Sequence, residues 1–277
     1  MIKFILLGIV QGLTEFLPVS SSGHLVIFQH VFGINKNVVF LDLVLHLGTL
    51  CSLLVFFRKD IFVLIYNFFI GVNDIIFHKR LPYILKYDDK FKLCIHIIVI
   101  TIVTGLIGLY RKDFFERQFI NLNTVIFSLL MMSVILFLTK NFIYGQRRLR
   151  HVSLKDSILF GFVQSLAIIP GISRSGITIS TLLFRNFDRE SAFKISFLAS
   201  IPIIFAAFIF KLKEIGSAAK DIPLPYLISG FLFAFLSGLV ALYILRLILK
   251  QKSFYKFSYY CFLLSVLILL LRLKNIL

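Results

Sequence analysis

The sequence predicts an all-α, polytopic membrane protein, and its composition, its long apolar runs and an internal repeat support that prediction. Of the 277 residues, 59% are hydrophobic and 16% are charged, and the mean hydropathy is +0.95. Soluble domains contain about 25% charged residues, and a chain of this length cannot bury so much apolar surface in its own core. The composition therefore excludes a disordered or fibrous chain and argues against a soluble enzyme.

Six apolar runs are long enough to cross a bilayer as helices, since one span takes about 20 residues. They cover residues 38–57, 93–110, 121–139, 193–210, 226–249 and 257–271. A further run, 61–77, contains two asparagines and Asp74, so we expect it to lie along the membrane interface. Because no linker divides the chain, we expect a single integral membrane domain over residues 1–277.

The net charge of +17 predicts the orientation of the chain in the membrane. Loops 78–92, 140–155 and 250–256 are strongly basic, whereas loops 111–120 and 211–223 mix both signs. Cytoplasmic loops of membrane proteins carry the excess of Lys and Arg. We therefore expect the three basic loops in the cytoplasm and both termini outside. The basic charge is explained by membrane anchoring, and nucleic acid is not expected as a partner.

Two other apolar stretches are too short or too polar for ordinary spans. Residues 2–17 contain Glu15 and end at Pro18. Residues 154–169 end at Pro170, and in both places Ser and Gly follow the proline. Irregular backbone at membrane depth is tolerated only where protein or a watery cavity covers it. We therefore predict two broken, re-entrant helices in addition to about six full spans.

The two broken segments are copies of one another. A shift of 153 residues aligns 8–23 with 161–176 without a gap, and 7 of the 16 positions are identical, among them Gly, Gln and Ser. Three predicted spans separate the copies, so the second copy enters the membrane from the opposite face. This predicts an inverted-topology repeat with halves at about 1–140 and 154–277, in which the two breaks meet near the midplane.

The polar residues of the two breaks form a set suited to holding a phosphate. They are Gln11, Glu15, Ser20, Ser21, Ser22 and His24 in the first break, and Gly171, Ser173, Arg174, Ser175 and Thr178 in the second. Helices that begin near Gly23 and Gly176 would offer free backbone N–H groups to an anion. Arg174 would add a fork that binds phosphate oxygens in pairs. Since ionisable groups inside membrane segments are costly and usually functional, we select Glu15, His24 and Arg174 as reactive groups.

Asp42 and His46 form a second polar pair in the next segment. Four residues apart on a helix, they share one face. They could orient an imidazole, relay a proton or support the site from behind. A polar pair satisfied within itself near the membrane surface is the simpler alternative.

Two long motifs resemble the signatures of a known family. The segments 15–24 and 170–178 resemble the two motifs of bacterial undecaprenyl-diphosphate phosphatases, the bacitracin-resistance family, and 42–49 is similar to the segment that follows the first motif. The resemblance covers nearly the whole chain. It implies hydrolysis of undecaprenyl diphosphate to undecaprenyl phosphate and inorganic phosphate. That reaction recycles the lipid carrier for peptidoglycan synthesis and confers bacitracin resistance.

The resemblance also implies roles for individual residues. Glu15, Ser21, His24 and Arg174 match the family's catalytic residues, and either Ser21 or His24 would be the nucleophile, with His24 as the expected base for a serine. A divalent cation, Mg or Ca, is implied, with Glu15 as its ligand. The chain departs from the family at Gln11, where Glu is frequent.

The resemblance further implies a place in the cell and a lipid partner. We expect the chain in the bacterial cytoplasmic (inner) membrane, with a site that faces the periplasmic side. The implied partner is the polyprenyl diphosphate substrate, and we also carry a homodimer as an expectation.

Other functions remain open at this point. A secondary transporter also uses inverted repeats and broken helices, with Glu15, Asp42 and His46 as ion or proton sites, but it has no particular need for two Ser-rich turns and an Arg. A flippase that moves the lipid carrier across the membrane would combine the transporter and phosphatase hypotheses. A lipid phosphatase related to acid phosphatases would share Ser22-Gly23-His24, yet that family needs a later His, and the last one here is His151.

Overall fold

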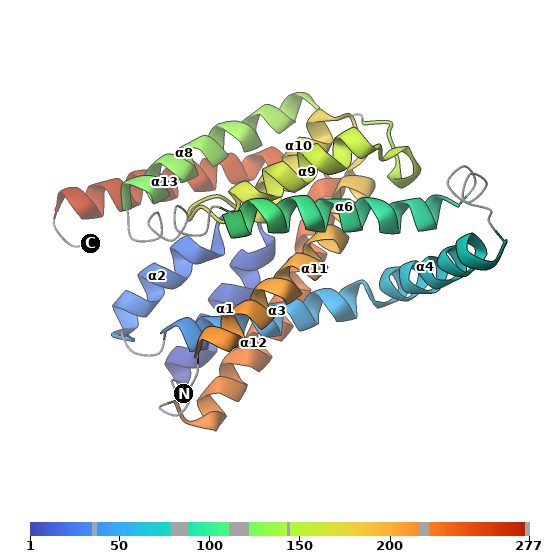
Figure 1. Cartoon of the computed structure of the whole chain (residues 1–277). Coiled ribbons are helices and arrows are strands. Elements are labelled where there is room, and N and C mark those ends of the chain that lie inside the picture. Colours follow the sequence, from blue (N-terminus) through green and yellow to red (C-terminus); the bar gives the residue numbers. More distant parts are fainter. Residues whose placement is uncertain (35–37, 79–87, 111–121, 143–144, 216–221, 275–277) are drawn as a thin grey trace.

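The computed structural model describes residues 1–34, 38–78, 88–110, 122–142, 145–215 and 222–274, and helices account for most of them. The helices before the second break are α1 (Ile2–Phe16), α2 (Ser21–Phe32), α3 (Val38–Phe56), α4 (Arg58–His78), α6 (Asp89–Tyr110), α8 (Leu122–Leu138) and the short turns η1 (Thr139–Asn141) and η2 (Leu149–His151). The last helix before that break is α9 (Leu154–Leu166), and after it come α10 (Arg174–Phe184), α11 (Arg189–Ile215), α12 (Leu224–Lys250), η4 (Phe254–Lys256) and α13 (Phe257–Leu273). The prediction of an all-α fold is confirmed (Figure 1).

Seven helices in the described residues are long and apolar enough to span a membrane. Six are the predicted spans, and the seventh, Arg58–Phe77 in α4, is the run that we expected at the interface. Helical hydrogen bonds continue through Phe57, whose N–H donates to Leu53 O at 2.9 Å, so α4 prolongs α3 rather than turning back (Figure 1). Four candidate spans now lie between the two breaks, so the predicted inverted orientation of the copies holds only if α4 does not cross the membrane.

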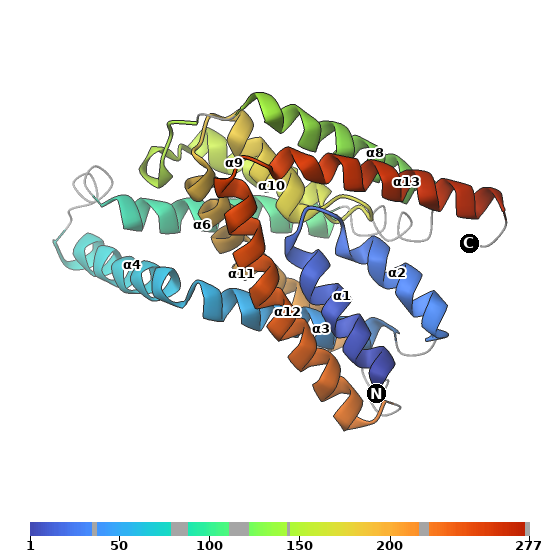
Figure 2. The ribbon, with the colours of Figure 1, turned by 180° about the vertical axis from the view of Figure 1, so that it is seen from behind.

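The two halves exchange their packing partners. The first broken helix, α1, packs on α12 of the second half, and its copy α9 packs on α6 of the first half. At Gly8 a Cβ atom would lie 2.4 Å from the Gly230 carbonyl oxygen, and at Gly161 it would lie 2.8 Å from the Val103 Cβ. Both glycines therefore allow close helix contact of the kind that small residues provide in membranes. Figure 2 shows a further long contact, in which α8 and α13 run side by side.

Each broken segment forms a hairpin of two helices, α1 with α2 and α9 with α10. In both hairpins a polar contact between equivalent positions joins the two helix ends that lie away from the break. In the first hairpin, Lys3 Nζ donates to Phe32 O at 2.6 Å. The positions 153 residues later are Asp156 and Arg185, and Arg185 Nε donates to Asp156 Oδ1 at 2.9 Å. Burial alone would raise the pKa of the Asp156 carboxyl, but its hydrogen bonds, those from Arg147 first among them, hold the pKa well below its ordinary value. Equivalent positions are thus joined by a lysine–carbonyl hydrogen bond in the first hairpin and by an arginine–carboxylate pair in the second.

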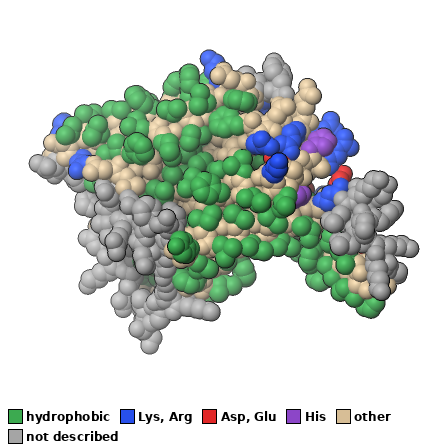
Figure 3. All heavy atoms as spheres, turned by 45° about the horizontal axis from the view of Figure 1, so that its top comes forward, with side chains coloured by type: hydrophobic (Ala, Val, Ile, Leu, Met, Phe, Trp, Pro, Cys, Tyr) green, Lys and Arg blue, Asp and Glu red, His purple; other side chains and the backbone are tan. Residues whose placement is uncertain are grey.

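The described parts of the basic loops gather at one end of the molecule. Lys140 belongs to the second basic loop and Tyr255 to the third, and Lys140 Nζ lies 5.7 Å from the centroid of the Tyr255 ring. The turn η2 in turn packs on α6, which begins at the end of the first basic loop. Figure 3 shows Lys and Arg side chains gathered with histidine beside an otherwise largely apolar surface. The prediction that these loops share one face is therefore supported.

Candidate active site

The backbone at both breaks has a conformation that few residues adopt. Ser20, just before α2, has φ +67°, and Gly171 in the second break has φ +91°. A side chain at Gly171 would also collide with α8, because its Cβ would lie 2.7 Å from the Ser128 Cβ. The helices that follow begin at Ser21 and Arg174, two residues earlier than predicted. Each turn therefore places a reactive side chain at the first position of a helix.

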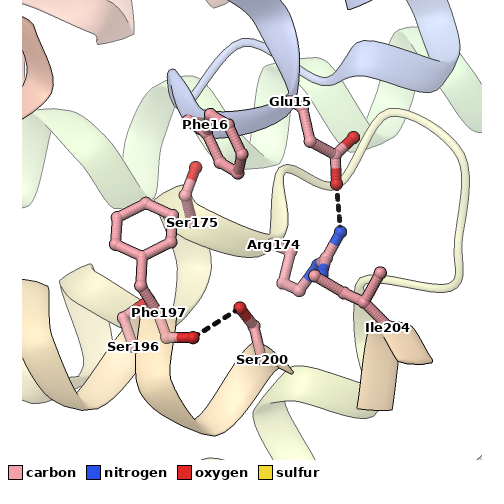
Figure 4. Close-up of a pocket in the computed structure, with 8 residues that line it drawn as sticks. All are labelled: Glu15, Phe16, Arg174, Ser175, Ser196, Phe197, Ser200 and Ile204. Atoms are coloured by element: carbon pink, nitrogen blue, oxygen red, sulfur yellow. Dashed lines mark hydrogen bonds and ion pairs between the residues drawn. The ribbon is translucent and has the colours of Figure 1, made fainter. Parts of the chain in front are cut away.

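The carboxylate of Glu15 lies between these two helix starts. One oxygen, Oε2, accepts hydrogen bonds from Ser21 Oγ at 2.7 Å and Gln11 Nε2 at 3.0 Å. The other oxygen, Oε1, accepts from Arg174 Nη2, as the dashed line in Figure 4 shows. His46 Nε2 lies 3.6 Å from Oε2. The two breaks therefore meet at one carboxylate, as the repeat predicted.

The two copies contribute different chemistry from equivalent positions. Ser21 and Arg174 are exactly one repeat apart, since a shift of 153 residues relates them. Both contact Glu15, whose own equivalent in the second copy is the apolar Ile168. Helix N-termini carry partial positive charge and bind anions. The first copy thus supplies a hydroxyl and a carboxylate, the second supplies the guanidinium, and both direct helix N-termini at the same point.

The remaining hydroxyls of the breaks also follow the repeat. Ser20 Oγ and Ser22 Oγ lie 3.3 Å apart, and their copies Ser173 Oγ and Ser175 Oγ lie 3.2 Å apart. Ser173 also caps α10 by accepting from the N–H of Gly176 at 3.2 Å. A capping serine fixes where a helix begins. The hydroxyl pairs therefore help to hold both helix starts in position.

His24 is buried but does not face Ser21. Its Nδ1 donates to the Ser20 carbonyl oxygen at 2.8 Å, and its Nε2 lies 2.6 Å from the hydroxyl of Tyr260 on α13. We expected His24 to be the base for a serine nucleophile. In the structure the group within hydrogen-bond distance of the Ser21 hydroxyl is instead the carboxylate of Glu15.

Asp42 and His46 do not form a carboxylate–imidazole pair. The Asp42 carboxylate accepts from Gln29 Nε2 at 2.6 Å, while His46 Nδ1 donates to the Asp42 backbone carbonyl at 2.7 Å. The backbone bond turns Nε2 of His46 toward Glu15. His46 therefore adjoins the site, and the hydrogen bond that orients it is made to the Asp42 backbone.

A small, partly open hollow adjoins the Glu15–Arg174 pair (Figure 4). It is lined by Glu15, Phe16, Arg174, Ser175, Ser196, Phe197, Ser200 and Ile204. Its lining is mixed, with polar groups from Glu15, Arg174 and three serines and apolar groups from Phe16, Phe197 and Ile204. A site for an amphipathic ligand needs both kinds of wall.

Three residues of this region were missed from the sequence: Ser196, Ser200 and Tyr260. Thr178 Oγ1 donates to the Arg174 carbonyl at 2.6 Å, so the contact at 2.7 Å with Ser196 is one in which the Ser196 hydroxyl donates. Thr178 thus steadies the start of α10 and does not itself line the hollow. Isolated serines and a tyrosine in apolar spans carry no signal that would have selected them.

One atom in the structure, Gln11 Oε1, is relevant to the divalent cation that the resemblance implies. Among the described residues no group of three His, Cys, Asp or Glu side chains could hold a metal ion. Gln11 Oε1, however, is buried and has no hydrogen-bond partner in the described part of the chain. Magnesium is often held by one or two protein oxygens together with substrate phosphates. Glu15 and Gln11 fit that pattern if the diphosphate supplies the remaining ligands.

The fold defines a multi-pass membrane protein in which two broken helices meet at the Glu15 carboxylate. The chain belongs to the family described as Bacitracin resistance protein BacA, which matches residues 4–267. It is similar to the undecaprenyl-diphosphatase of Alkaliphilus metalliredigens, with 42% identity over 98% of each chain. The undecaprenyl-diphosphatases of Halothermothrix orenii, 40% identical over 97% of each chain, and Carboxydothermus hydrogenoformans, 42% identical over 97% of this chain and 96% of that one, are also similar.

Proposed function

We propose that this membrane enzyme hydrolyses undecaprenyl diphosphate to undecaprenyl phosphate and inorganic phosphate. The reaction recycles the lipid carrier for peptidoglycan synthesis and confers bacitracin resistance. The observation that carries the proposal is the Glu15 carboxylate, which contacts a hydroxyl from one break and a guanidinium from the other. The similarity to undecaprenyl-diphosphatases over nearly the whole chain supports it independently.

Substrate binding would begin at Arg174 and the two helix N-termini. Phosphoryl transfer depends mainly on positioning and on neutralising charge. The terminal phosphate takes the place of the Glu15 oxygen that now contacts Arg174, and the apolar residues of the hollow contact the first part of the lipid. Arg174 then holds two phosphate oxygens, which its planar fork allows.

Ser21 is the nucleophile that the geometry favours. As its Oγ bonds to the terminal phosphorus, its proton passes to Glu15 Oε2, 2.7 Å away, and the bond from phosphorus to the bridging oxygen breaks. The electron pair of that bond leaves with undecaprenyl phosphate, to which Glu15 delivers the proton. A nucleophilic hydroxyl needs such an adjacent base.

Water completes the reaction at the phosphoserine. Glu15, again ionised, takes a proton from the water as the water oxygen bonds to phosphorus. The Ser21 Oγ–phosphorus bond breaks, the serine regains a proton from Glu15, and inorganic phosphate leaves. Trapping of the intermediate distinguishes this route from one in which His24 carries the phosphoryl group.

A divalent cation, Mg or Ca, fits the same site. Glu15 and the free Gln11 Oε1 would hold it next to the diphosphate. When bound, it supplies positive charge that offsets the charge of the phosphate oxygens.

The basic end of the molecule indicates how the chain is oriented in the membrane. We place that end in the cytoplasm, following the rule for Lys and Arg, which makes this a protein of the cytoplasmic (inner) membrane with its site open to the outer, periplasmic side. The variants Arg148→Cys and Lys3→Cys, each labelled with an impermeant reagent in whole cells, test this orientation. Light scattering of the detergent-solubilised protein tests the homodimer.

Phosphate release from C55 diphosphate by the purified protein tests the function directly. In detergent there is no gradient, so a transporter releases no phosphate, whereas the phosphatase releases one phosphate per lipid. Addition of a chelator tests the cation. The matched variants Ser21→Ala and Ser22→Ala remove neighbouring hydroxyls, of which only Ser21 contacts Glu15. We expect turnover to be lost in Ser21→Ala and to fall less than about tenfold in Ser22→Ala.

A further inference from the structure

Both ring nitrogens of His24 are held by fixed partners. The Ser20 carbonyl can only accept, so Nδ1, 2.8 Å from it, carries the hydrogen. A neutral imidazole then has its lone pair on Nε2, where it can accept from the Tyr260 hydroxyl at 2.6 Å. The two rings are stacked, with centroids 5.8 Å apart and planes inclined by 14°. His24 is only 6% exposed, so Tyr260 is its neighbour on the side of Nε2.

Tyr260 is itself held against the first break, although 236 residues separate it from His24. The next residue, Cys261, is fully buried and its thiol donates to the Pro18 carbonyl at 3.3 Å. Tyr259 and Tyr260 are similarly exposed, at 55% and 45%, but the Tyr259 ring meets Phe137 edge-on at 6.5 Å instead of His24. Helix α13 thus docks on the break through Tyr260 and Cys261, while Tyr259 points elsewhere.

We propose that Tyr260 is a positioning residue that acts through His24. Its hydroxyl fixes the plane of the imidazole, whose Nδ1 binds the Ser20 carbonyl, so that a helix of the second half holds the turn next to the nucleophile Ser21. The role in turnover rests on the proposed phosphatase function. The contact itself does not, and the two can be tested separately.

The variant Tyr260→Phe removes the hydroxyl and keeps the ring. Loss of this part-buried hydrogen bond corresponds to a fall in kcat of roughly 3- to 10-fold. We expect KM to stay within twofold, because Tyr260 does not line the phosphate site. The control is Tyr259→Phe, which makes the same change one residue away, and we expect it to match the wild type in kcat. Equal kcat in the two variants would overturn the proposal, as would a KM effect alone.

A second measurement reports on the contact without substrate. Diethyl pyrocarbonate modifies the neutral nitrogen of imidazole, and peptide mass spectrometry follows the modification at His24 alone. Release of Nε2 from the hydroxyl should make His24 react several-fold faster in Tyr260→Phe than in the wild type and in Tyr259→Phe, at equal melting temperatures. An unchanged rate would show that the hydroxyl does not hold His24. Because this assay needs no turnover, it tests the hydrogen bond between His24 and Tyr260 even if the wild type releases no phosphate.

Discussion

Substitution of Glu15 by Gln isolates the carboxylate with almost no change of shape. In the structure both oxygens accept hydrogen bonds, Oε2 from Ser21 and Gln11 and Oε1 from Arg174. An amide offers one oxygen and one NH₂ group. In either orientation the NH₂ group faces a donor, so at least one of these contacts is lost.

The expected magnitude follows from two losses. Removal of a positioned base typically slows a reaction by about 10²–10⁴-fold, or about 3–5 kcal/mol. Breaking a buried ion pair costs about 3–5 kcal/mol of stability, and we expect the lower end because the Arg174 side chain is 25% exposed. Glu15→Gln should therefore retain less than about 1% of wild-type kcat and have a lower melting temperature.

The assay is phosphate release from C55 diphosphate in detergent, with thermal unfolding measured in parallel. The matched control is Glu190→Gln, which makes the same change in a peripheral pair where Arg246 Nη2 lies 2.6 Å from Glu190 Oε1. That side chain is 38% exposed and far from the phosphate contacts, so we expect kcat within about threefold of wild type. More than a tenth of wild-type kcat in Glu15→Gln, or an equal loss in Glu190→Gln, would refute the role of Glu15 as base.

Three further predictions follow from the same geometry. Arg174→Lys keeps the charge but loses the planar fork, so kcat/KM should fall about 100-fold, nearly as far as in Arg174→Ala, and wild-type kcat/KM would show that a point charge suffices. Gln11→Glu puts a second carboxylate beside the first, so a chelator titration of activity should show stronger dependence on divalent cation; an unchanged titration would argue against a cation at this position. Gly8→Val, with a backbone oxygen 2.4 Å from the new Cβ, should lower the melting temperature by about 5 °C or more. Gly105→Ala, whose nearest neighbour is 4.0 Å away, serves as its control and should melt like the wild type.

The features that could be predicted are those encoded locally or by the repeat. The matches of Gly8 with Gly161 and of the serine pairs are explained by equivalent helix contacts and equivalent hydroxyl pairs. Polar residues in an apolar chain located both breaks, because burial in the membrane makes such residues costly.

Other features depend on contacts that no local pattern contains. His24 is three residues from Ser21, but the turn of α2 directs it to Tyr260, and a helical periodicity cannot show which group lies across the interface. For the same reason Ser196 on α11 was missed. The run in α4 was assigned to the interface because three polar residues were given more weight than its length, yet it is apolar enough to be a candidate span.

The most direct test of the central claim is a rapid-quench experiment with C55 diphosphate labelled in its terminal phosphate, followed by mass spectrometry of the protein. The account predicts a phosphoryl group on Ser21 in the wild type and none in Ser21→Ala, which should also fail to release phosphate. A phosphoryl group on His24, or undiminished phosphate release by Ser21→Ala, would contradict it.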